Sequence, residues 1–375
     1  MNKYADIIPM SLRAMHFVMP GTVDDLTKPS GGNTYDARVC FDLPAFGWQV
    51  HKHAIDGSWP QPSAAARAEL ARTLSEIADG SRVLLDGLVA CAAPEIIAAE
   101  TERLHLVVLV HLPLGDETGI DPGLAAELDA RERRTLRSVP AIVATSEWAA
   151  RRLVAHHGLA PDRVHVAAPG ADIAPLAAGT DGVSRLLCVA SVTPRKAQHR
   201  LVEALATLTD LNWSCVCVGG LGQDPEYVTE IRELIDRHGL GDRLQLVGPQ
   251  AGAELDASYA SADLLVLTSY AETYGMAVTE ALARGIPVLA TDVGGLPEAV
   301  GRAPDGGMPG ILVPPDNSAA LAAELRGWFV DTDVRRRLRA AARGRRAALD
   351  GWAATARSLA GVLGRLGRDA RKGAA

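Results

Sequence analysis

The stretch LLVLTSYAETYGMAVTEALARGIPVLATDVGGLPE, residues 264–298, carries the densest set of structural signals in the chain. Apolar runs at 264–268 and 287–290 predict two buried strands. Between them Gly275 permits a tight turn into a helix, and Gly285 followed by Pro287 predicts where that helix ends. The stretch is therefore predicted to form a strand–helix–strand unit of a parallel sheet.

The start of this predicted helix is the first candidate site. The turn at Gly275 leaves the amides of Met276, Ala277 and Val278 unpaired, and a helix N-terminus at the carboxyl edge of a parallel sheet attracts anions such as a diphosphate.

Two glutamates flank the helix start. Glu272 precedes it and Glu280 lies inside the helix. Carboxylates there are poor diphosphate ligands but good acceptors for sugar hydroxyls, so we assign Glu272 to a transferred sugar and Glu280 to a ribose. The alternatives are a capping glutamate and a solvated helix glutamate.

Short apolar runs alternate with helical patterns along nearly the whole chain, which is typical of parallel sheets with crossover helices. The predicted strands of the first half are 16–19, 49–55, 82–85, 106–110, 141–145 and 164–167, with helices at 63–79, 122–138 and 147–157. Residues 168–184 are rich in Gly, Pro and Ala and read as a linker. The predicted strands of the second half are 185–190, 213–218, 244–247, 264–268 and 287–290, and helices from about 319 to 367 follow.

These patterns predict an α/β chain of two Rossmann-like, doubly wound parallel-sheet domains facing across a cleft. We expect an N-terminal domain at 1–172, a C-terminal domain at 183–350, and a final helix at 351–375 that can pack back on the first domain.

Composition excludes several classes of protein. A net charge of -7, with 48% hydrophobic and 22% charged residues, fits a soluble globular protein and gives no nucleic-acid footprint. The five cysteines are scattered and suit a reducing compartment. Residues 1–15 lack an apolar leader segment, so we expect a cytoplasmic protein without a membrane span.

Residues 272–298 resemble the donor-binding signature of glycosyltransferase family 4: two glutamates separated by seven residues, a glycine in the phosphate-binding turn, and a Gly-Gly-Leu-Pro-Glu loop. The resemblance implies the GT-B fold and retaining transfer from a nucleotide sugar without a bound metal or other cofactor. It also implies that residues 1–172 bind the acceptor and residues 183–350 bind the nucleotide sugar. It also places Thr273 and Tyr274, together with residues 275–278, at the donor.

The segment SVTPRKAQHRLVEAL, which begins at Ser191, is similar to the family's phosphate-binding loop. Lys196 falls on the lysine position. The arginine position falls on Ser191, which removes a bidentate phosphate clamp, and the neighbouring Arg195 is the candidate replacement. An exposed, solvated pair at a helix start is the alternative for Arg195 and Lys196.

Three further places extend the resemblance. Gly31 and Gly32 lie in a segment similar to the family's glycine-rich turn, where backbone approaches the donor phosphates and acceptor. His111 ends a strand where related enzymes keep a histidine facing the donor sugar, held through its ring and its backbone carbonyl. Gly248 and Pro249 fall where the family's loop packs on the nucleobase. The bland alternatives are a surface turn and a structural histidine.

The function implied is transfer of a hexose or N-acetylhexosamine, with a UDP-sugar favoured over a GDP-sugar and a glycan, lipid or small molecule as acceptor. His111, Glu272 and Lys196 are the candidate catalytic residues. The alternatives are a nucleotide-sugar 2-epimerase, an inactive GT-B partner subunit and an inverting GT-B transferase.

Some features are set aside. Asp331-Thr-Asp333 imitates a metal motif but is predicted to cap a helix. His156-His157 and His51-x-His53 lack a carboxylate or third ligand at convincing spacing, so no metal site is expected. Ser146 is predicted to be only a helix cap. The seven arginines of 335–346 could contact anionic lipid, but a solvated helix face is favoured.

Overall fold

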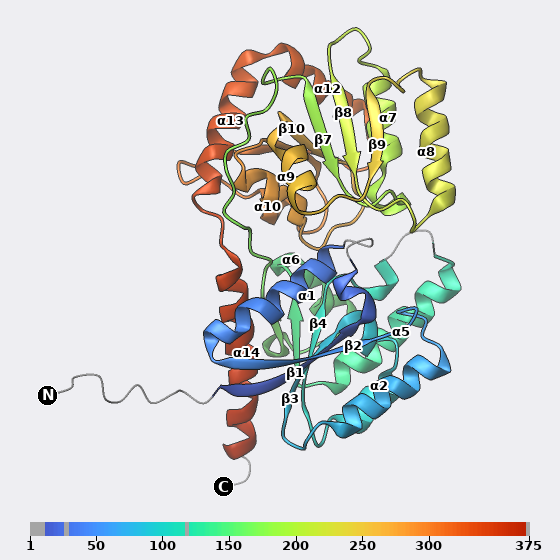
Figure 1. The fold of residues 1–375 in the computed structure, drawn as a ribbon, viewed down its shortest axis with the longest axis vertical. Helices are drawn as coiled ribbons and strands as arrows, with labels where there is room; N and C mark the ends of the chain where they lie inside the picture. The colour runs from blue at the N-terminus through green and yellow to red at the C-terminus, as the bar shows by residue number, and fades with distance from the viewer. Residues whose placement is uncertain (1–11, 26–29, 117–119, 373–375) are drawn as a thin grey trace, which may run out of the picture.

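Two six-stranded sheets form the centres of two domains in the computed structural model, which describes residues 12–25, 30–116 and 120–372 (Figure 1). The first sheet contains β1 (Arg13–Pro20), β2 (Trp48–Ile55), β3 (Arg82–Asp86), β4 (His105–Val110), β5 (Ala141–Ala144) and β6 (Val164–Val166). The second contains β7 (Arg185–Val189), β8 (Ser214–Val218), β9 (Leu244–Gly248), β10 (Leu264–Leu267), β11 (Val288–Thr291) and β12 (Gly310–Val313).

All neighbouring strands in both sheets are parallel. The first sheet has the order β2-β1-β3-β4-β5-β6, and the second has β12-β11-β10-β7-β8-β9. The direction of chain progression therefore reverses between β1 and β3 in the first sheet, and between β7 and β10 in the second. Open parallel sheets bind ligands at such switch points, so this topology confirms the predicted fold class and marks two places to search.

Helices cover both faces of the first sheet. They are α1 (Gly31–Asp42), α2 (Ala64–Glu76), α3 (Gly87–Ala90), α4 (Pro94–Glu100), α5 (Pro122–Ser138) and α6 (Glu147–His157), with 3-10 turns η1 (Gly21–Asp24), η2 (Leu43–Phe46), η3 (Leu114–Asp116) and η4 (Pro161–Arg163). Successive strand residues point to opposite faces. Val83 and Leu85 pack with the core of α2, α5 and α6, whereas Leu84 packs with that of α1.

The second domain is built around one large apolar cluster. Its helices are α7 (Gln198–Ala206), α8 (Pro225–Arg237), α9 (Gly252–Ala260), α10 (Met276–Ala283), α11 (Leu296–Val300), α12 (Ser318–Val330) and α13 (Thr332–Arg346), with the 3-10 turn η5 (Pro194–Lys196). The helix predicted after Gly275 is α10. Gly285 has φ 69°, and the Ile286 amide donates to Ala281 O, so this helix ends with the predicted left-handed glycine.

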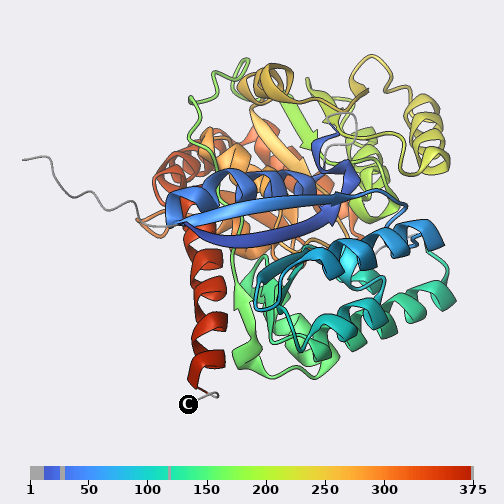
Figure 2. The same ribbon diagram turned by 60° about the horizontal axis from the view of Figure 1, so that its bottom comes forward.

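The chain crosses between the domains twice. It first crosses without helix or strand between β6 and β7, and it returns after α13 into α14 (Trp352–Lys372). Figures 1 and 2 show α14 running along the N-terminal domain. Trp352 and Leu359 are buried in the same core as Tyr35 of α1, so the last helix completes the first domain.

Several local details differ from the predictions. The elements α1, α3, α4 and β12 were not predicted, and Gly31 and Gly32 begin a helix rather than form a turn. Residues 1–11, and with them most of the segment expected to lack a leader, lie outside the described residues. Within the described part of the chain, no helix is long and apolar enough to cross a membrane.

Candidate functional site

The predicted site residues gather at the two switch points. In the second sheet, Ser191, Arg195 and Lys196 follow β7, and residues 272–275 follow β10 and lead into α10. In the first sheet, α1 follows β1 and His111 follows β4. Both sets lie where the two domains meet, because Thr273 bonds to His111 and Met276 approaches Gly31.

The start of α10 is an uncapped helix end. Gly275 has φ 101°, and a Cβ there would lie 2.5 Å from Leu296 Cδ2, so only glycine fits. Gly275 has no side chain to cap the helix, which leaves the amides of Met276 and Ala277 available. The Val278 amide was also predicted to be unpaired. This is wrong, because it donates to Gly275 O at 2.9 Å and so closes the first turn.

A second helix start faces the first across the domain interface. A Cβ built on Gly31, the first residue of α1, would lie 3.5 Å from Met276 Sδ. The Ser30 side chain caps α1 by accepting from the Asn33 amide at 3.0 Å. The Met276 side chain therefore reaches the start of α1. Two helix N-termini near each other carry like partial charges, and an anion between them would relieve their repulsion.

Glu272 lies in a cationic pocket of the second domain. Its Oε1 pairs with Lys196 Nζ and accepts from Ser269 Oγ at 2.9 Å. Burial alone raises the pKa of Glu272, but the positive charges of Lys196 and Arg195 outweigh burial and lower it below the ordinary value. Lys196 is therefore half-buried against a carboxylate rather than solvated.

Arg195, the candidate replacement for the arginine of the phosphate loop, contacts the loop that carries Glu272. Arg195 Nη1 donates to Ala271 O at 3.3 Å, which directs the guanidinium along the loop that carries Glu272. Ser191 is half-buried, and its carbonyl accepts from Gln198 Nε2 at 2.9 Å.

The Gly-Gly-Leu-Pro-Glu loop packs directly against the backbone of the loop that carries Glu272. The Gly295 amide donates to Glu272 O at 2.9 Å. A Cβ on Gly294 would lie 1.8 Å from that same oxygen, and one on Gly295 would lie 2.2 Å from Thr273 O. The two glycines are required because the two loops touch backbone to backbone.

Glu280 lies one and a half turns into α10, with a hydrogen-bonded neighbour. Its Oε2 accepts from Tyr259 Oη at 2.6 Å, and Tyr259 is fully buried. Burial raises the pKa of Glu280, while the bond to Tyr259 and the charge of Arg284 act against burial. The Tyr259 bond orients the partly buried Glu280 carboxylate through Oε2, and among the described residues Oε1 has no hydrogen-bond partner.

Thr273 joins the two domains. Its Oγ1 donates to His111 O at 2.6 Å, and its own carbonyl accepts from Ser146 Oγ at 2.6 Å. Ser146 also caps α6 by accepting from the Ala149 amide at 2.9 Å, so the prediction that capping is its only role is wrong.

Glu298 makes a second link between the domains at the same helix start. Both its carboxylate oxygens accept from the Glu147 amide at 3.1 Å, and Oε2 also accepts from the Trp148 amide at 3.3 Å. A carboxylate of the second domain therefore sits on the positive end of a helix of the first.

The Nε2 edge of the His111 ring faces two aspartates. Its Nε2 lies 2.8 Å from Asp36 Oδ1 and 3.5 Å from Asp86 Oδ2. Burial lowers the pKa of His111, and the negative charge of Asp86 opposes this. A Cβ on Gly32 would lie 3.2 Å from the ring, so Gly32 provides room for His111 rather than a turn.

The remaining predicted residues lie beside these. Gly248 ends β9 with φ 82°, and the Gly219 amide donates to its carbonyl at 2.9 Å, while Pro249 is exposed. Tyr274 lines a cavity of 250 Å³ between the domains, and the other predicted site residues do not line it.

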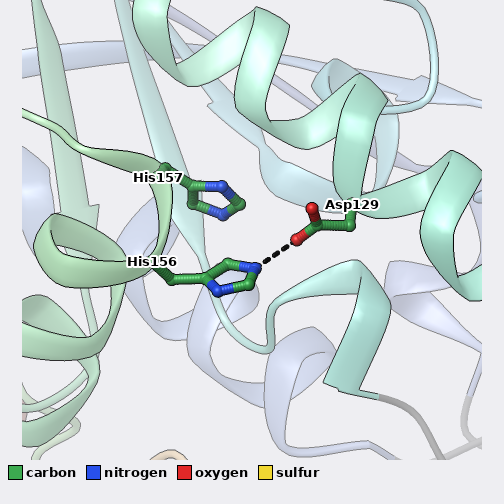
Figure 3. Close-up of side chains that lie close together, drawn as sticks. All are labelled: Asp129, His156 and His157. Atoms are coloured by element: carbon green, nitrogen blue, oxygen red, sulfur yellow. Dashed lines mark hydrogen bonds and ion pairs between the residues drawn. The ribbon is translucent and has the colours of Figure 1, made fainter.

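The paired histidines prove to have acidic partners. Figure 3 shows the side chains of Asp129, His156 and His157 facing one another, and their ligand atoms lie within 4.8 Å, close enough to hold a metal. The prediction that no carboxylate is near is therefore wrong. Asp129 also pairs with Arg133, and His157 Nε2 lies 3.0 Å from Glu132 Oε2, so these groups already tie α5 to α6 away from the candidate site.

The Asp331-Thr-Asp333 motif and the arginines of α13 also have roles within the fold. Asp331 accepts from the Asp333 and Val334 amides at 2.8 and 3.1 Å, which confirms capping. Four of the arginines in α13 donate to backbone carbonyls of the protein, so the face is only partly a solvated one; these are Arg335, Arg339, Arg345 and Arg346.

Sequence reasoning missed four contributors to this region. Asp86 directly follows the apolar run of β3, and this carboxyl-edge position was a usable signal. Asp36 lies in the unpredicted α1, and the cross-domain bonds of Ser146 and Glu298 depend on the domain arrangement, so no local signal could have identified them.

Two family models match the chain. The model "Glycosyl transferases group 1" matches residues 180–345, and "Glycosyltransferase Family 4" matches residues 81–174.

Relatives and solved structures agree with these models. D-inositol 3-phosphate glycosyltransferase of Jonesia denitrificans is 29% identical over 293 residues, covering 72% of this chain and 68% of the relative. Its namesake in Nocardia farcinica is 33% identical over 246 residues, covering 61% and 53%. The chain thus spans about half to two thirds of these curated relatives.

Among solved structures, sucrose-phosphate synthase of Thermosynechococcus elongatus has a TM-score of 0.77 at 20% identity, covering 94% of this chain and 99% of that one. Anabaena HepE in complex with UDP-glucose has a TM-score of 0.75 at 20% identity, covering 94% and 100%. At this identity the likeness shows the GT-B fold. The two matched models, which together cover residues 81–174 and 180–345, place the chain in glycosyltransferase family 4, a family of transferase enzymes.

Proposed function

We propose that the chain transfers a hexose or N-acetylhexosamine from a nucleoside diphosphate sugar to an acceptor, with retention at the anomeric carbon and without a bound metal. The observation that carries this proposal is the uncapped start of α10, which lies between Glu272 and Glu280 and faces the start of α1. A uridine donor is favoured, and the UDP-glucose bound by HepE supports this choice.

The charges around α10 supply what the leaving group needs. As the glycosidic bond breaks, negative charge grows on the diphosphate, and preorganised amides and cations stabilise it. A diphosphate beside Met276 competes with Glu272 for Lys196, which frees a Glu272 oxygen for a sugar hydroxyl. Glu280 then binds the ribose, and Tyr259 orients it.

Retention follows from attack by the acceptor on the face that the leaving diphosphate vacates. We prefer this front-face displacement to the two-carboxylate route of retaining glycosidases, because we assign Glu272 to a sugar hydroxyl and name no residue as a covalent nucleophile. The acceptor stays open. The relatives are named for D-inositol 3-phosphate, so this compound belongs in any acceptor panel.

The first test is donor binding, measured as thermal stabilisation by UDP-glucose, UDP-N-acetylglucosamine, GDP-mannose and UDP alone. A ligand at 100 times its Kd adds about 2.7 kcal/mol to the free energy of unfolding. We expect Glu280→Ala to weaken the stabilisation by UDP. Glu254→Ala, which alters an exposed glutamate of the neighbouring α9, is the control.

The outcomes separate the alternative functions. An inactive partner subunit is stabilised by none of these nucleotides. An epimerase converts the sugar of its donor with no acceptor present, whereas a transferase requires the acceptor for rapid turnover. Inversion of the anomeric configuration in the product, read by NMR, would refute the retaining mechanism.

A further inference from the structure

Two buried acids and a histidine meet on the N-terminal side of the proposed site. Asp36 of α1 and Asp86 at the end of β3 are 1% and 2% exposed, and both contact the His111 ring. A carboxylate oxygen of Asp36, one of Asp86 and a ring nitrogen of His111 all lie within 4.8 Å of one another, so the two acids are neighbours. Two carboxylates in contact and away from water cannot both be ionised, so this pair must hold a proton.

The bonding pattern shows which acid holds the proton. Asp86 Oδ1 accepts from the Leu88 amide at 2.6 Å, which leaves Oδ2 to carry a proton toward Asp36. Asp36 Oδ1 lies 2.8 Å from His111 Nε2. With the proton on Asp86, Asp36 is a carboxylate that accepts from two donors, and charge-assisted bonds of this kind are the stronger ones.

Burial supports the shared proton. It raises the pKa of Asp36 and of Asp86, and the charge of Asp36 raises that of Asp86 further. Other titratable groups near the pair come from α1, β2 and the end of α3: Tyr35, Cys40, Lys52 and Cys91. Lys52 is the cation among them, and it is ion-paired with Asp24.

The His111 ring is held in one orientation. The Cβ position of Gly32 is 3.2 Å from Cδ2 and 3.8 Å from Nε2, so this ring edge faces α1. The Tyr35 ring packs edge-on at 5.1 Å between centroids. Nδ1 lies on the opposite side of the ring, and among the described residues it has no hydrogen-bond partner.

We propose that Asp86 keeps its proton and donates a hydrogen bond to the Asp36 carboxylate. Asp36 in turn accepts from the Nε2–H of His111, so that Nδ1 is left as a hydrogen-bond acceptor for a hydroxyl of the transferred sugar. Asp36 and Asp86 are then positioning residues that fix the tautomer of His111. The role of Nδ1 toward the sugar rests on the proposed function, whereas the placement of the protons does not.

The experiment compares two isosteric, neutral replacements. Asp86→Asn keeps an acceptor for the Leu88 amide and a donor for Asp36, so it imitates the protonated acid. Asp36→Asn removes the negative partner of His111. The tautomer is read in the full chain by ¹⁵N NMR of histidine-labelled protein between pH 6 and 8, with the His111 signals assigned by their loss in His111→Gln.

We expect protonated Nε2 and bare Nδ1 in the unaltered chain and in Asp86→Asn, and a population protonated on Nδ1 in Asp36→Asn. Nδ1–H in the unaltered chain overturns the proposal even if Asp36→Asn fails to fold. Equal effects of the two replacements also overturn it. Broadening of the His111 signals by low concentrations of Mn²⁺ would show a cation between the acids instead of a proton.

Turnover gives a second, separate readout. If the proposed function holds, Asp36→Asn lowers kcat about 10- to 100-fold with little change in the KM for the donor, because a charge-assisted hydrogen bond is lost. A chain that binds no nucleotide sugar refutes the proposed function but leaves the tautomer result intact. An unchanged kcat in Asp36→Asn, with the tautomer altered, refutes only the role of Nδ1.

Discussion

The sequence comparison assigns Ser191 to the position where the family's phosphate loop has an arginine, and this assignment can be tested. Because Arg195 is directed toward Ala271 O, we expect Ser191→Arg to supply a missing clamp and to tighten UDP binding about tenfold or more, measured by isothermal titration. Ser191→Gln adds length without charge and serves as the control. Unchanged affinity in Ser191→Arg would mean that Arg195 already reaches the phosphates.

The ion pair of Lys196 and Glu272 makes stability depend on pH. The pKa of Glu272 is lowered in the folded state, so its contribution is present above the unfolded-state pKa of about 4.3 and is lost as the pH falls through the folded value. Lys196→Met leaves a buried, unpaired carboxylate, and we expect it to lower the free energy of unfolding by about 1–3 kcal/mol at pH 7 and by less at pH 4.

Urea unfolding at both pH values measures this effect. Lys52→Met is the control, because its partner Asp24 has 72% of its side chain exposed, whereas that of Glu272 is 10% exposed. Exposed pairs contribute little. An equal loss in the two variants, or a loss in Lys196→Met that grows as the pH falls, would contradict the buried pairing.

At the scale of elements, the start of α6 is both a helix cap and an interdomain contact. Ser146→Ala removes the cap and the bond to Thr273 O together. Ser63 caps α2 in the same way, with an acceptor bond to the Ala66 amide at 3.2 Å, and Ser63→Ala loses a cap alone. Each replacement should lower stability by about 1 kcal/mol.

We expect only Ser146→Ala to loosen the domain contact, seen as a larger radius of gyration in small-angle X-ray scattering and weaker binding of UDP. Equal radii of gyration for the two variants would show that Glu298 and the two chain crossings hold the domains together without Ser146.

Elements with strong local signals could be predicted from sequence. The helix α10 is fixed by Gly275 at its start and by Gly285 and Pro287 at its end, and the structure has it there. The helix α1 was missed because Gly31 and Gly32 are poor helix formers. The helix forms nevertheless because Ser30 caps its start and Gly32 lies against the His111 ring. It therefore depends little on the helix propensity of the two glycines.

The candidate site was only half accessible to sequence reasoning. Glu272, Glu280 and Lys196 belong to short motifs whose spacing is visible. Asp36 and His111 are brought together over 75 positions by the order of β1, β3 and β4, and that order cannot be read from local patterns.

At the scale of the whole molecule, the two crossings between domains touch each other. The Ala171 amide donates to Asp350 O at 2.9 Å, and a Cβ on Gly170 would lie 2.2 Å from Trp352 N. We expect Gly170→Ala to lower the free energy of unfolding by about 1–3 kcal/mol through overpacking.

Gly351→Ala is the matched control for this hinge. A Cβ there would have 3.8 Å to the nearest atom, Ala171 O. Thermal unfolding of both variants is the measurement. Equal stability of the two would show that the crossings separate readily, and that the close approach at Gly170 is not a constraint.

The return of the chain into α14 also sets an order for biosynthesis. Trp352, Leu359 and Leu363 fill the core beside Met15 and Phe17, which the ribosome makes more than three hundred residues earlier. Until residues 352–363 have been made, that apolar surface lacks its cover, while the second domain already has its own separate core. The N-terminal domain is synthesised before the second domain, but its core is completed after that of the second domain.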